Sequence, residues 1–375
     1  MPAFILLLLA AGWHGTGEGQ EASEDGLSAL RQRLASGNKV RLAFYGASHT
    51  ASDGYTHPIR EALQRRYGNG GFGLFLPASP FPFYERRGVS LSGRGFTGFK
   101  VRYHEREPGP YGPMGFGLES NERATARAEF DEPLEVDEAA IAFEQMPDGG
   151  RICVTLGDDE ECVRTRGPGR TRFVALEYVG LVERVRVRAT GHVRLYGLSL
   201  ERTRGVVVDS FGVPGARADD QLPWSSRSLR QAIDQRPIDL AAFAYGTNES
   251  ARAGQASDRP RLRQVVRRLS REAPSCALIG PGEWPRFRRG EPRPRPRTLQ
   301  VIAQQRRVAE EFGCAFFDTY AWMGAPGVMA RLVPLGLAQP DHVHFTDAGY
   351  ERLGRALTAW IEGRAVPTLR LPAEN

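Results

Sequence analysis

The chain has 375 residues, of which 41% are apolar and 25% are charged, and these proportions exclude a mostly disordered or fibrous protein. Its formal net charge is +6, and because Lys39 and Lys100 are the only lysines, arginine supplies nearly all of the positive charge. Acidic residues are interspersed with the arginines, so this modest surplus does not indicate nucleic-acid binding.

The N-terminus contains a short apolar run, residues 4–12, followed by small and polar residues. This run is too short to span a bilayer and is typical of the core of a secretory signal peptide. We therefore expect residues 1–19 to be a signal peptide and the protein to be exported to the periplasm or the extracellular space. A mis-assigned start or a short buried strand is the alternative. No later segment is apolar enough for a transmembrane helix, so no integral membrane association is expected.

Two regions show an alternation of helices and strands. In the first, the pattern predicts a helix over 24–37, a strand over 40–45, and a second helix that ends at the glycines 68–71. In the second, strands over 205–210, 240–245, 276–280 and 314–318 alternate with helices over 226–234, 258–272, 298–312 and 347–362. This rhythm predicts a parallel sheet covered by helices on both faces.

Between these regions, residues 86–202 have the sequence pattern of an all-β module. Strand-length runs at 139–144, 151–156, 172–179, 185–188 and 192–196 are separated by Gly, Pro and Asp, with no convincing helix. This pattern indicates a β-sandwich or jelly roll. We therefore expect one α/β domain in two parts, 24–85 and 203–366, interrupted by a β insertion over 86–202 and followed by a tail over 367–375.

One biased segment, residues 286–297, holds six arginines interleaved with prolines. We predict a loop here, because Pro292, Pro294 and Pro296 oppose a helix or a central strand. Its arginines are interpreted either as a solvated surface or as a contact for an anionic glycan beside the cleft.

The four cysteines leave two interpretations open. Cys153 and Cys162 flank a predicted hairpin tip, and Cys276 and Cys314 each begin a strand-like run, so two disulfides or four buried thiols are both compatible. Their spacing does not suggest a zinc site.

Chemically versatile residues follow the predicted strands, at the sheet edge where open α/β folds bind ligands. Ser48 follows the first strand, Gly215 the strand from 205 and Asn248 the strand from 240, while Asp341 stands three residues before His344. Together they supply a nucleophile, a base, an orienting acid and oxyanion donors, which are the groups that acyl transfer needs.

These motifs resemble the sequence blocks of the SGNH (GDSL-like) hydrolase superfamily. Gly46-Ala47-Ser48 stands for Gly-Asp-Ser, Gly215 for the second-block glycine, Gly246-Thr247-Asn248 for Gly-x-Asn, and Asp341-His342-Val343-His344 for Asp-x-x-His. The run from Ser48 to Asp53 resembles the Ser-His-x-x-x-Asp variant of cell-wall O-acetylesterases, which also carry a β-sandwich insertion. The resemblance implies a flavodoxin-like, three-layer α/β fold with a parallel sheet.

The resemblance also implies an exported serine esterase that deacetylates an O-acetylated polysaccharide, above all peptidoglycan. Ser48 would be the nucleophile and His344, oriented by Asp341, the base. The oxyanion hole would combine the backbone N–H groups of Ser48 and Gly215 with the side chain of Asn248. No cofactor and no metal are implied. The alternatives are a polysaccharide O-acetyltransferase using the same triad and a non-catalytic glycan-binding protein.

The sequence leaves the roles of several residues open. Ala47 replaces the aspartate usual before the nucleophile, which removes a loop-ordering carboxylate and motivates the non-catalytic alternative. His49 and Asp53 are expected to order the loop rather than to react. His342 competes with His344 as the base, and Gly212 competes with Gly215 as the oxyanion glycine. The β insertion is expected to recognise the polymer, with a rigid stabilising cap as the alternative.

Overall fold

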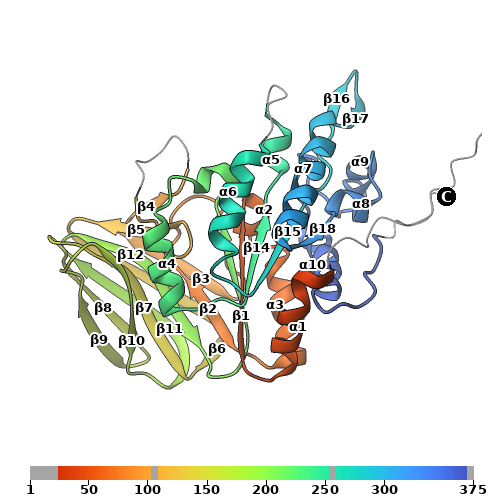
Figure 1. Ribbon diagram of the computed structural model, residues 1–375. Helices are drawn as coiled ribbons and strands as arrows, with labels where there is room; N and C mark the ends of the chain where they lie inside the picture. Colours follow the sequence, from red (N-terminus) through yellow and green to blue (C-terminus); the bar gives the residue numbers. More distant parts are fainter. Residues whose placement is uncertain (1–23, 103–108, 253–257, 370–375) are drawn as a thin grey trace, which may run out of the picture.

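The computed structural model describes residues 24–102, 109–252 and 258–369 (Figure 1). The predicted signal peptide and the end of the predicted tail lie outside the described residues. None of the helices within the described ranges combines the length and the apolar character needed to cross a membrane.

A five-stranded parallel sheet, here called sheet A, lies at the centre of the α/β part. Its spatial order is β13 (Gly205–Gly212), β1 (Lys39–Gly46), β14 (Leu240–Ala244), β15 (Ser275–Ile279) and β18 (Ala315–Phe317). In chain order this is 2-1-3-4-5, the flavodoxin-like arrangement, so the predicted fold class is confirmed.

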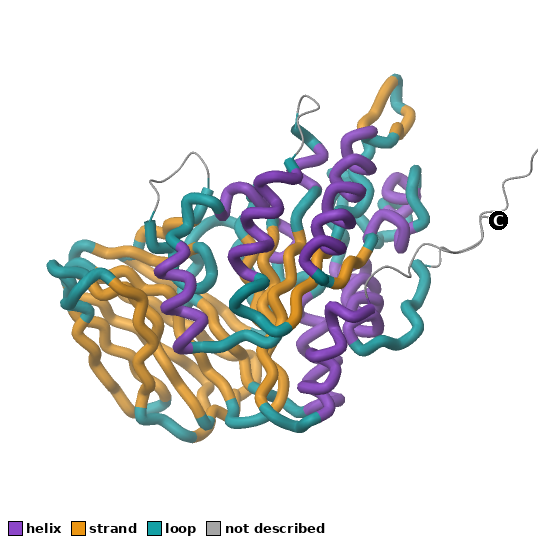
Figure 2. Tube along the Cα trace, in the orientation of Figure 1, coloured by secondary structure: helices purple, strands orange, loops and turns teal. Residues whose placement is uncertain are grey.

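Helices cover both faces of sheet A (Figure 2). A 3₁₀ turn, η1 (Glu24–Leu27), leads into the helices of one face, α1 (Ser28–Ala35), α3 (Thr56–Tyr67) and α10 (Asp347–Ile361), whose apolar residues join one core cluster. The opposite face is covered by α6 (Arg259–Leu269) and α7 (Pro296–Phe312), whereas α4 (Ser226–Gln235) packs against β10 (Arg170–Leu176) of the insertion. Each helix buries one apolar stripe, as the sequence periodicity predicts.

The insertion consists of two antiparallel sheets and lies on one side of the α/β part (Figure 1). Sheet B has the order β10 (Arg170–Leu176), β7 (Glu138–Gln145), β12 (Val193–Glu201), β5 (Phe116–Ser120) and β4 (Thr97–Lys100). Sheet C has the order β3 (Val89–Arg94), β6 (Arg123–Val136), β11 (Gly180–Thr190), β8 (Arg151–Leu156) and β9 (Asp159–Arg164). Their facing apolar residues form one core, which makes the insertion a β-sandwich.

One strand was missed by the sequence analysis because its residues looked like a helix-terminating glycine cluster. β2 (Gly71–Phe75) follows α3 directly and pairs antiparallel with β12 of sheet B. It therefore carries the chain from the α/β part into the sandwich. Gly71 needs to be glycine here, because its φ is +101° and a Cβ would lie 2.5 Å from the backbone of Glu201.

A buried ion-pair network holds the insertion against sheet A. Arg236 contacts Glu201, at the end of β12, at 2.7 Å and Asp209, in β13, at 2.6 Å. Arg41 of β1 contacts the same Glu201 at 2.6 Å, and the backbone N–H of Leu74 in β2 donates to Asp209 at 2.9 Å. Because Glu201, Asp209 and Arg236 are buried and mutually paired, the sandwich has a defined orientation relative to sheet A.

The prediction of a loop over 286–297 was wrong. β16 (Arg286–Arg288) and β17 (Glu291–Arg293) form an isolated two-stranded hairpin, and α7 begins at Pro296. Pro292 is accommodated because both strands of an isolated hairpin are edge strands. Pro296 is accommodated because the first turn of a helix needs no backbone N–H partner.

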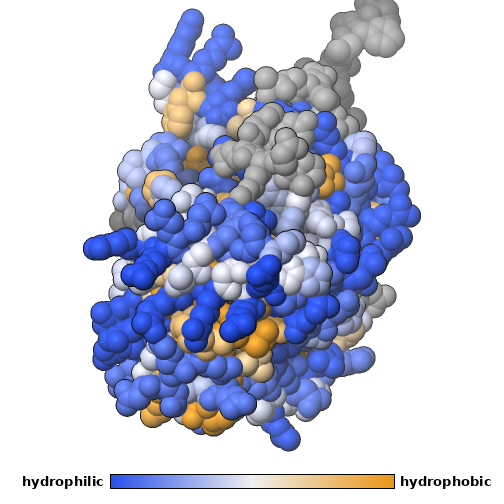
Figure 3. All heavy atoms as spheres, turned by 90° about the vertical axis from the view of Figure 1, so that its left-hand side faces the viewer, coloured by the Kyte–Doolittle hydropathy of each residue, from blue (hydrophilic) through white to orange (hydrophobic). Residues whose placement is uncertain are grey.

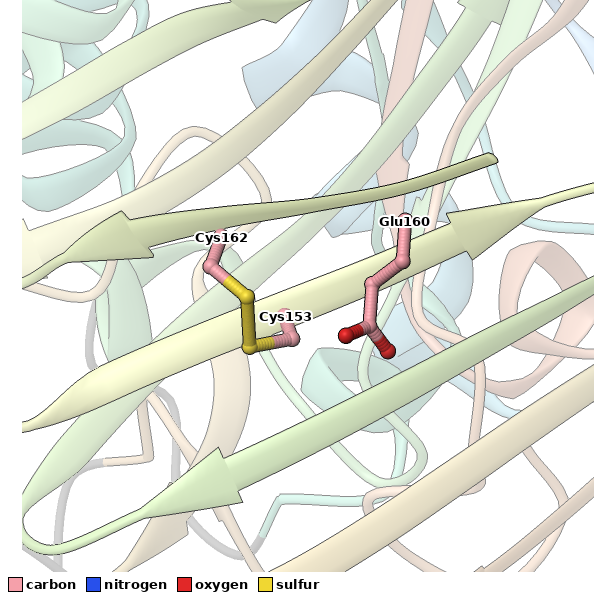
Figure 4. A group of neighbouring side chains, drawn as sticks. All are labelled: Cys153, Glu160 and Cys162. Atoms are coloured by element: carbon pink, nitrogen blue, oxygen red, sulfur yellow. A yellow bond between two sulfur atoms is a disulfide. The ribbon is translucent and has the colours of Figure 1, made fainter. Parts of the chain in front are cut away.

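Both disulfides left open by the sequence are present. Cys153 and Cys162 are directly opposite each other on β8 and β9 and are joined, with Glu160 beside them (Figure 4). Cys276 and Cys314 precede paired residues of β15 and β18 and are also joined. Cys153, Cys162 and Glu160 lie close enough to hold a metal ion, but the disulfide leaves the two cysteines without a thiolate that could bind one.

Candidate active site

Ser48 lies where the central strand β1 ends and a short helix, α2 (Ser48–Ala51), begins. Its neighbour Gly46 is in register with Gly212 of β13 on one side and with Ala244 of β14 on the other. The carboxyl ends of three adjacent strands therefore meet around Ser48. This is the edge at which parallel α/β sheets place their ligands.

His344 and Asp341 approach Ser48 from the loop before α10. Nε2 of His344 lies 2.8 Å from Oγ of Ser48, and Nδ1 of His344 lies 2.6 Å from Oδ2 of Asp341. A carboxylate only accepts, so Nδ1 carries the proton and Nε2 is left to accept a hydrogen bond from the Ser48 hydroxyl. The three predicted triad residues thus form one continuous hydrogen-bonded chain.

The carboxylate of Asp341 is held by its own loop. Its Oδ1 accepts hydrogen bonds from the backbone N–H groups of Val343 and His344, at 2.9 and 3.0 Å. Partial burial favours the neutral acid, but the hydrogen bonds from the His344 side chain and these two N–H groups hold the pKa of Asp341 below its ordinary value. Asp341 is therefore ionised and in position to orient the imidazole.

Gly212 and Gly215, the two candidates for the oxyanion glycine, require glycine for different structural reasons. A Cβ on Gly212 would lie 2.1 Å from the backbone N of Ala51, so glycine is needed there for α2 to pack against β13. Gly215 has a φ of +75° and lies in the loop after β13, where such a left-handed conformation favours glycine. The loop is tied to the end of β1 by the backbone hydrogen bond from Val213 N–H to Gly46 O, at 2.9 Å.

Asn248 and Glu249 connect the loops that follow β13 and β14. Both belong to a short helix, α5 (Thr247–Ser250). The side-chain amide of Asn248 donates to the carbonyl of Ala216 at 2.8 Å, one residue after Gly215. Glu249 accepts from the N–H of Ala218 at 2.8 Å and from the N–H of Gly246 at 2.9 Å. The glycine loop and the asparagine turn are thus fixed relative to each other.

Glu249 was missed by the sequence analysis. It is almost completely buried, and this burial raises its pKa to about 7. The available signal was local: a carboxylate three residues after Gly246 can bond back to that residue's N–H and cap the helix start. The second partner, Ala218, lies in another turn, η2 (Ala218–Gln221), and could not be read from this spacing.

His49 lies beside the triad and does not extend the hydrogen-bonded chain. Its Nδ1 is hydrogen-bonded to the hydroxyl of Tyr350 on α10 at 2.8 Å, and its ring centroid lies 4.9 Å from that of His344. Burial and the neighbouring His344 lower the pKa of His49 to about 3. His49 is therefore neutral at physiological pH and braces α2 against α10.

Asp53 occupies the bend after α2. It is fully buried, has a φ of +51°, and contacts Arg60 at 2.7 Å. Its carboxylate also accepts hydrogen bonds from the Thr56 hydroxyl at 2.6 Å and from the Arg87 N–H at 3.1 Å. Despite the opposing effect of burial, the Arg60 and Arg86 guanidinium groups hold its pKa well below the ordinary range.

Ala47 itself is buried and begins α2 without a side-chain cap. The chain after Ser48 is instead secured by the buried carboxylate of Asp53, five residues further on.

The ring of His342, the alternative candidate for the base, contacts Phe287. His342 has a φ of +57°, and its ring centroid lies 4.7 Å from that of Phe287 in the β16–β17 hairpin. The arginine-rich hairpin therefore touches the loop that carries Asp341 and His344, a contact that the sequence analysis raised only as a possible flank of the cleft.

A small cavity of about 40 Å³ lies beside these residues. Its lining includes the chain neighbours of three site residues: His49 follows Ser48, Thr247 precedes Asn248, and Val343 precedes His344. By the volume that one buried water needs, this cavity has room for about three water molecules. It is too small for a sugar ring.

Comparisons with known proteins show what the chain is similar to. Residues 166–352 match the model of the GDSL-like Lipase/Acylhydrolase family. A solved peptidoglycan O-acetylesterase aligns with a TM-score of 0.77 at 20% sequence identity, covering 92% of this chain and 97% of its own. A lipase/acylhydrolase from Enterococcus faecalis and a variant of an acetyl xylan esterase from Geobacillus stearothermophilus each share 24% identity over 77% of their own chains. These two cover 43% and 44% of this chain, with TM-scores of 0.34 and 0.35. No curated protein sequence matches the chain significantly.

The chain therefore belongs to the SGNH (GDSL-like) hydrolases and is, by class, a serine carboxylic-ester hydrolase. Its fold over nearly the whole length, with the β-sandwich inserted into the α/β domain, resembles that of the solved peptidoglycan O-acetylesterase.

Proposed function

We propose that this protein is an exported esterase that removes O-acetyl groups from a polysaccharide, with peptidoglycan as the substrate. The observation that carries the proposal is the chain of hydrogen bonds from Ser48 through His344 to Asp341, at 2.8 and 2.6 Å. The same arrangement of hydroxyl, imidazole and carboxylate activates serine nucleophiles on unrelated folds.

The reaction begins when Ser48 Oγ attacks the acetyl carbonyl carbon while His344 Nε2 accepts the hydroxyl proton. The resulting imidazolium is stabilised by the ionised Asp341. His344 then gives this proton to the sugar oxygen as the ester bond breaks, which leaves an acetyl group on Ser48. A water molecule attacks the acetyl-enzyme, its proton passes through His344 back to Ser48, and acetate is released.

The oxyanion of each tetrahedral intermediate is stabilised by the backbone N–H groups of Ser48 and Gly215 and by the amide of Asn248. One N–H of this amide is bonded to Ala216, so the side chain is fixed before substrate arrives and its second N–H remains for the oxyanion. Glu249 supports this assignment, because it holds the two donor-bearing loops together.

One observation supports the substrate class. The solved protein that matches over 92% of this chain is a peptidoglycan O-acetylesterase.

Export is supported by the apolar N-terminal run at residues 4–12 and by the two disulfides. Disulfides form and persist in oxidising compartments such as the periplasm and the extracellular space.

The test is acetate release from p-nitrophenyl acetate and from O-acetylated peptidoglycan by the wild type and by Ser48→Ala. We expect Ser48→Ala to keep its fold and to lose activity on both substrates. Ser52→Ala, a change of a serine at the end of the same helix, is the matched control and should retain activity. Full activity of folded Ser48→Ala would overturn the proposal.

A further inference from the structure

The outward face of sheet C carries a groove that the esterase reaction does not use. It has a volume of about 600 Å³, within the usual range of ligand-binding sites, about 300–1,000 Å³. It runs across β3, β6 and β11, and five of its eleven lining residues are arginines: Arg94, Arg123, Arg127, Arg186 and Arg188. No acidic residue is among those that line it.

The strand register places these charges against one another. Arg127 of β6 is directly opposite Arg186 of β11, and Arg94 of β3 and Arg188 of β11 flank Thr125 of β6 on its two sides. Like charges directly opposite each other destabilise a sheet. An anionic ligand bound between these arginines would relieve this repulsion.

Ion pairing accounts for only two of the five arginines. Arg127 is bonded to Glu129 of its own strand, and Arg188 contacts Glu160 of β9 at 2.5 Å. Within the described part of the chain, Arg94, Arg123 and Arg186 form no ion pair. Their guanidinium groups are exposed and have donors to offer to a ligand.

The chemistry of the lining favours one class of anion. Arginine binds a carboxylate through two parallel hydrogen bonds, and the hydroxyls of Ser92 and Thr125 lie between the arginines, suited to sugar hydroxyls. The lining has no aromatic residue on which nucleobases could stack and no large apolar residue that could enter a lipid layer. On the side of the insertion shown in Figure 3, hydrophilic residues likewise cover most of the surface.

The face is also rigid enough to recognise a polymer. The Cys153–Cys162 disulfide joins β8 to β9 on the same outward side, and Cys153 is in register with Arg188 of β11 (Figure 4). Arg186 and Arg188 are two residues apart on β11, about 7 Å, and Arg123 and Arg127 are four residues apart on β6, about 13 Å. Arg127 and Arg186 face each other across neighbouring strands, about 5 Å apart, so an extended chain with repeated carboxylates can contact several arginines at once.

We propose that this groove of sheet C binds a carboxylate-bearing polysaccharide, which we infer to be the peptidoglycan that the triad deacetylates. The inference rests on the proposed function for the identity of the polymer. The groove holds the polymer through its carboxylates, and the α/β part performs the chemistry.

The test compares two charge-matched variants, each in a Ser48→Ala background so that bound polymer is not altered. The groove variant is Arg94→Gln/Arg123→Gln/Arg186→Gln, which removes the three arginines without ion partners. The control is Arg267→Gln/Arg271→Gln/Arg307→Gln, which removes three exposed arginines around α6 and α7. Binding is measured by co-sedimentation with purified peptidoglycan sacculi, with sacculi whose carboxylates have been amidated, and with a phosphate polyanion, double-stranded DNA.

We expect the groove variant to bind native sacculi about tenfold more weakly than the parent and the control to bind like the parent. The parent should bind amidated sacculi as weakly as the groove variant binds native sacculi. This last arm needs no groove variant, so it tests the proposal even if the triple substitution impairs folding.

Unchanged binding by a folded groove variant, an equal loss in the control, or tighter binding to DNA than to sacculi would each overturn the proposal. Its failure is separable from that of the proposed function, because binding is measured without turnover. In the Ser48 enzyme, p-nitrophenyl acetate hydrolysis should be the same for the groove variant and the control. Absence of Ser48-dependent hydrolysis would count against the esterase proposal alone.

Discussion

The ring of Phe287, in the β16–β17 hairpin, lies against the ring of His342, with centroids 4.7 Å apart. His342 lies between Asp341 and His344 in sequence and has a left-handed backbone conformation. The hairpin thus contacts the loop that carries His344, the proposed base, and Asp341, its proposed orienting acid.

Phe287→Ala should therefore impair catalysis through loop position. An aromatic pair contributes about 0.5–1.5 kcal/mol, so we expect kcat on p-nitrophenyl acetate to fall about 2- to 13-fold with little change in KM. The melting temperature should barely change, because Phe287 is 48% exposed. Leu335→Ala, at a residue 42% exposed, is the control. Wild-type kcat in Phe287→Ala would show that the contact does not position the loop.

Asp341→Asn tests the orienting acid. An amide can donate to Nδ1 and so stabilise the wrong tautomer of His344, and it cannot stabilise the imidazolium. We expect kcat to fall about 10⁴-fold, as in other triads, with an unchanged melting temperature. The matched control is Asp234→Asn on the exposed side of α4. A loss below about tenfold would assign the orienting role to another group.

Asn248→Ala tests the oxyanion donor. Loss of one such donor costs about 10²–10³ in kcat, because the charge of the intermediate is no longer stabilised. Substrate binding should change little, since the donor acts mainly on the intermediate. Asn121→Ala, at an exposed position of the insertion, is the control. An effect confined to KM would contradict the assignment.

Glu249→Gln tests the buried carboxylate and gives a pH signature. Burial raises the folded-state pKa from 4.5 to about 7, so between these values the unfolded chain has released a proton that the folded chain retains. Stability from this group therefore falls as pH rises from about 4.5 to about 7, by about 3 kcal/mol in total. Chemical denaturation across this range should show the wild type losing stability relative to Glu249→Gln. Parallel curves for the two proteins would contradict the raised pKa.

The two disulfides should contribute unequally. Cys276–Cys314 closes a loop with a sequence separation of 38 and Cys153–Cys162 one of 9. Loop-closure entropy gives about 4 kcal/mol for the first and about 3 kcal/mol for the second. Removal of the second should cost even less than this, since β8 and β9 already pair in a hairpin. Denaturation of the two double Cys→Ala variants checks the order, and a larger loss for Cys153–Cys162 would reverse it.

The local sequence was sufficient for most of the α/β architecture. Apolar runs at strand length and helical spacing predicted the strands and main helices of sheet A, because both periodicities depend only on residues close in the chain. The short blocks around Ser48, Asn248 and Asp341 likewise marked candidate site residues at strand ends. Their catalytic roles remain predictions that the variants above would test.

Tertiary structure decided what depends on partners distant in the chain. β2 was hidden in a glycine cluster and becomes a strand only because β12 supplies its hydrogen-bond partners. The β16–β17 hairpin exists despite Pro292, because neither of its strands needs a second neighbour.

The same holds for the site. Sequence spacing left His342 and His344 as competitors, and only the packing of α10 against α3, together with the hairpin, turns one toward Ser48 and the other toward Phe287. Glu249 and Tyr350 acquire their contacts from Ala218 and His49, on separate elements. A local pattern can specify which residues are available and which way a segment folds, whereas the distances between segments follow from how their apolar faces pack.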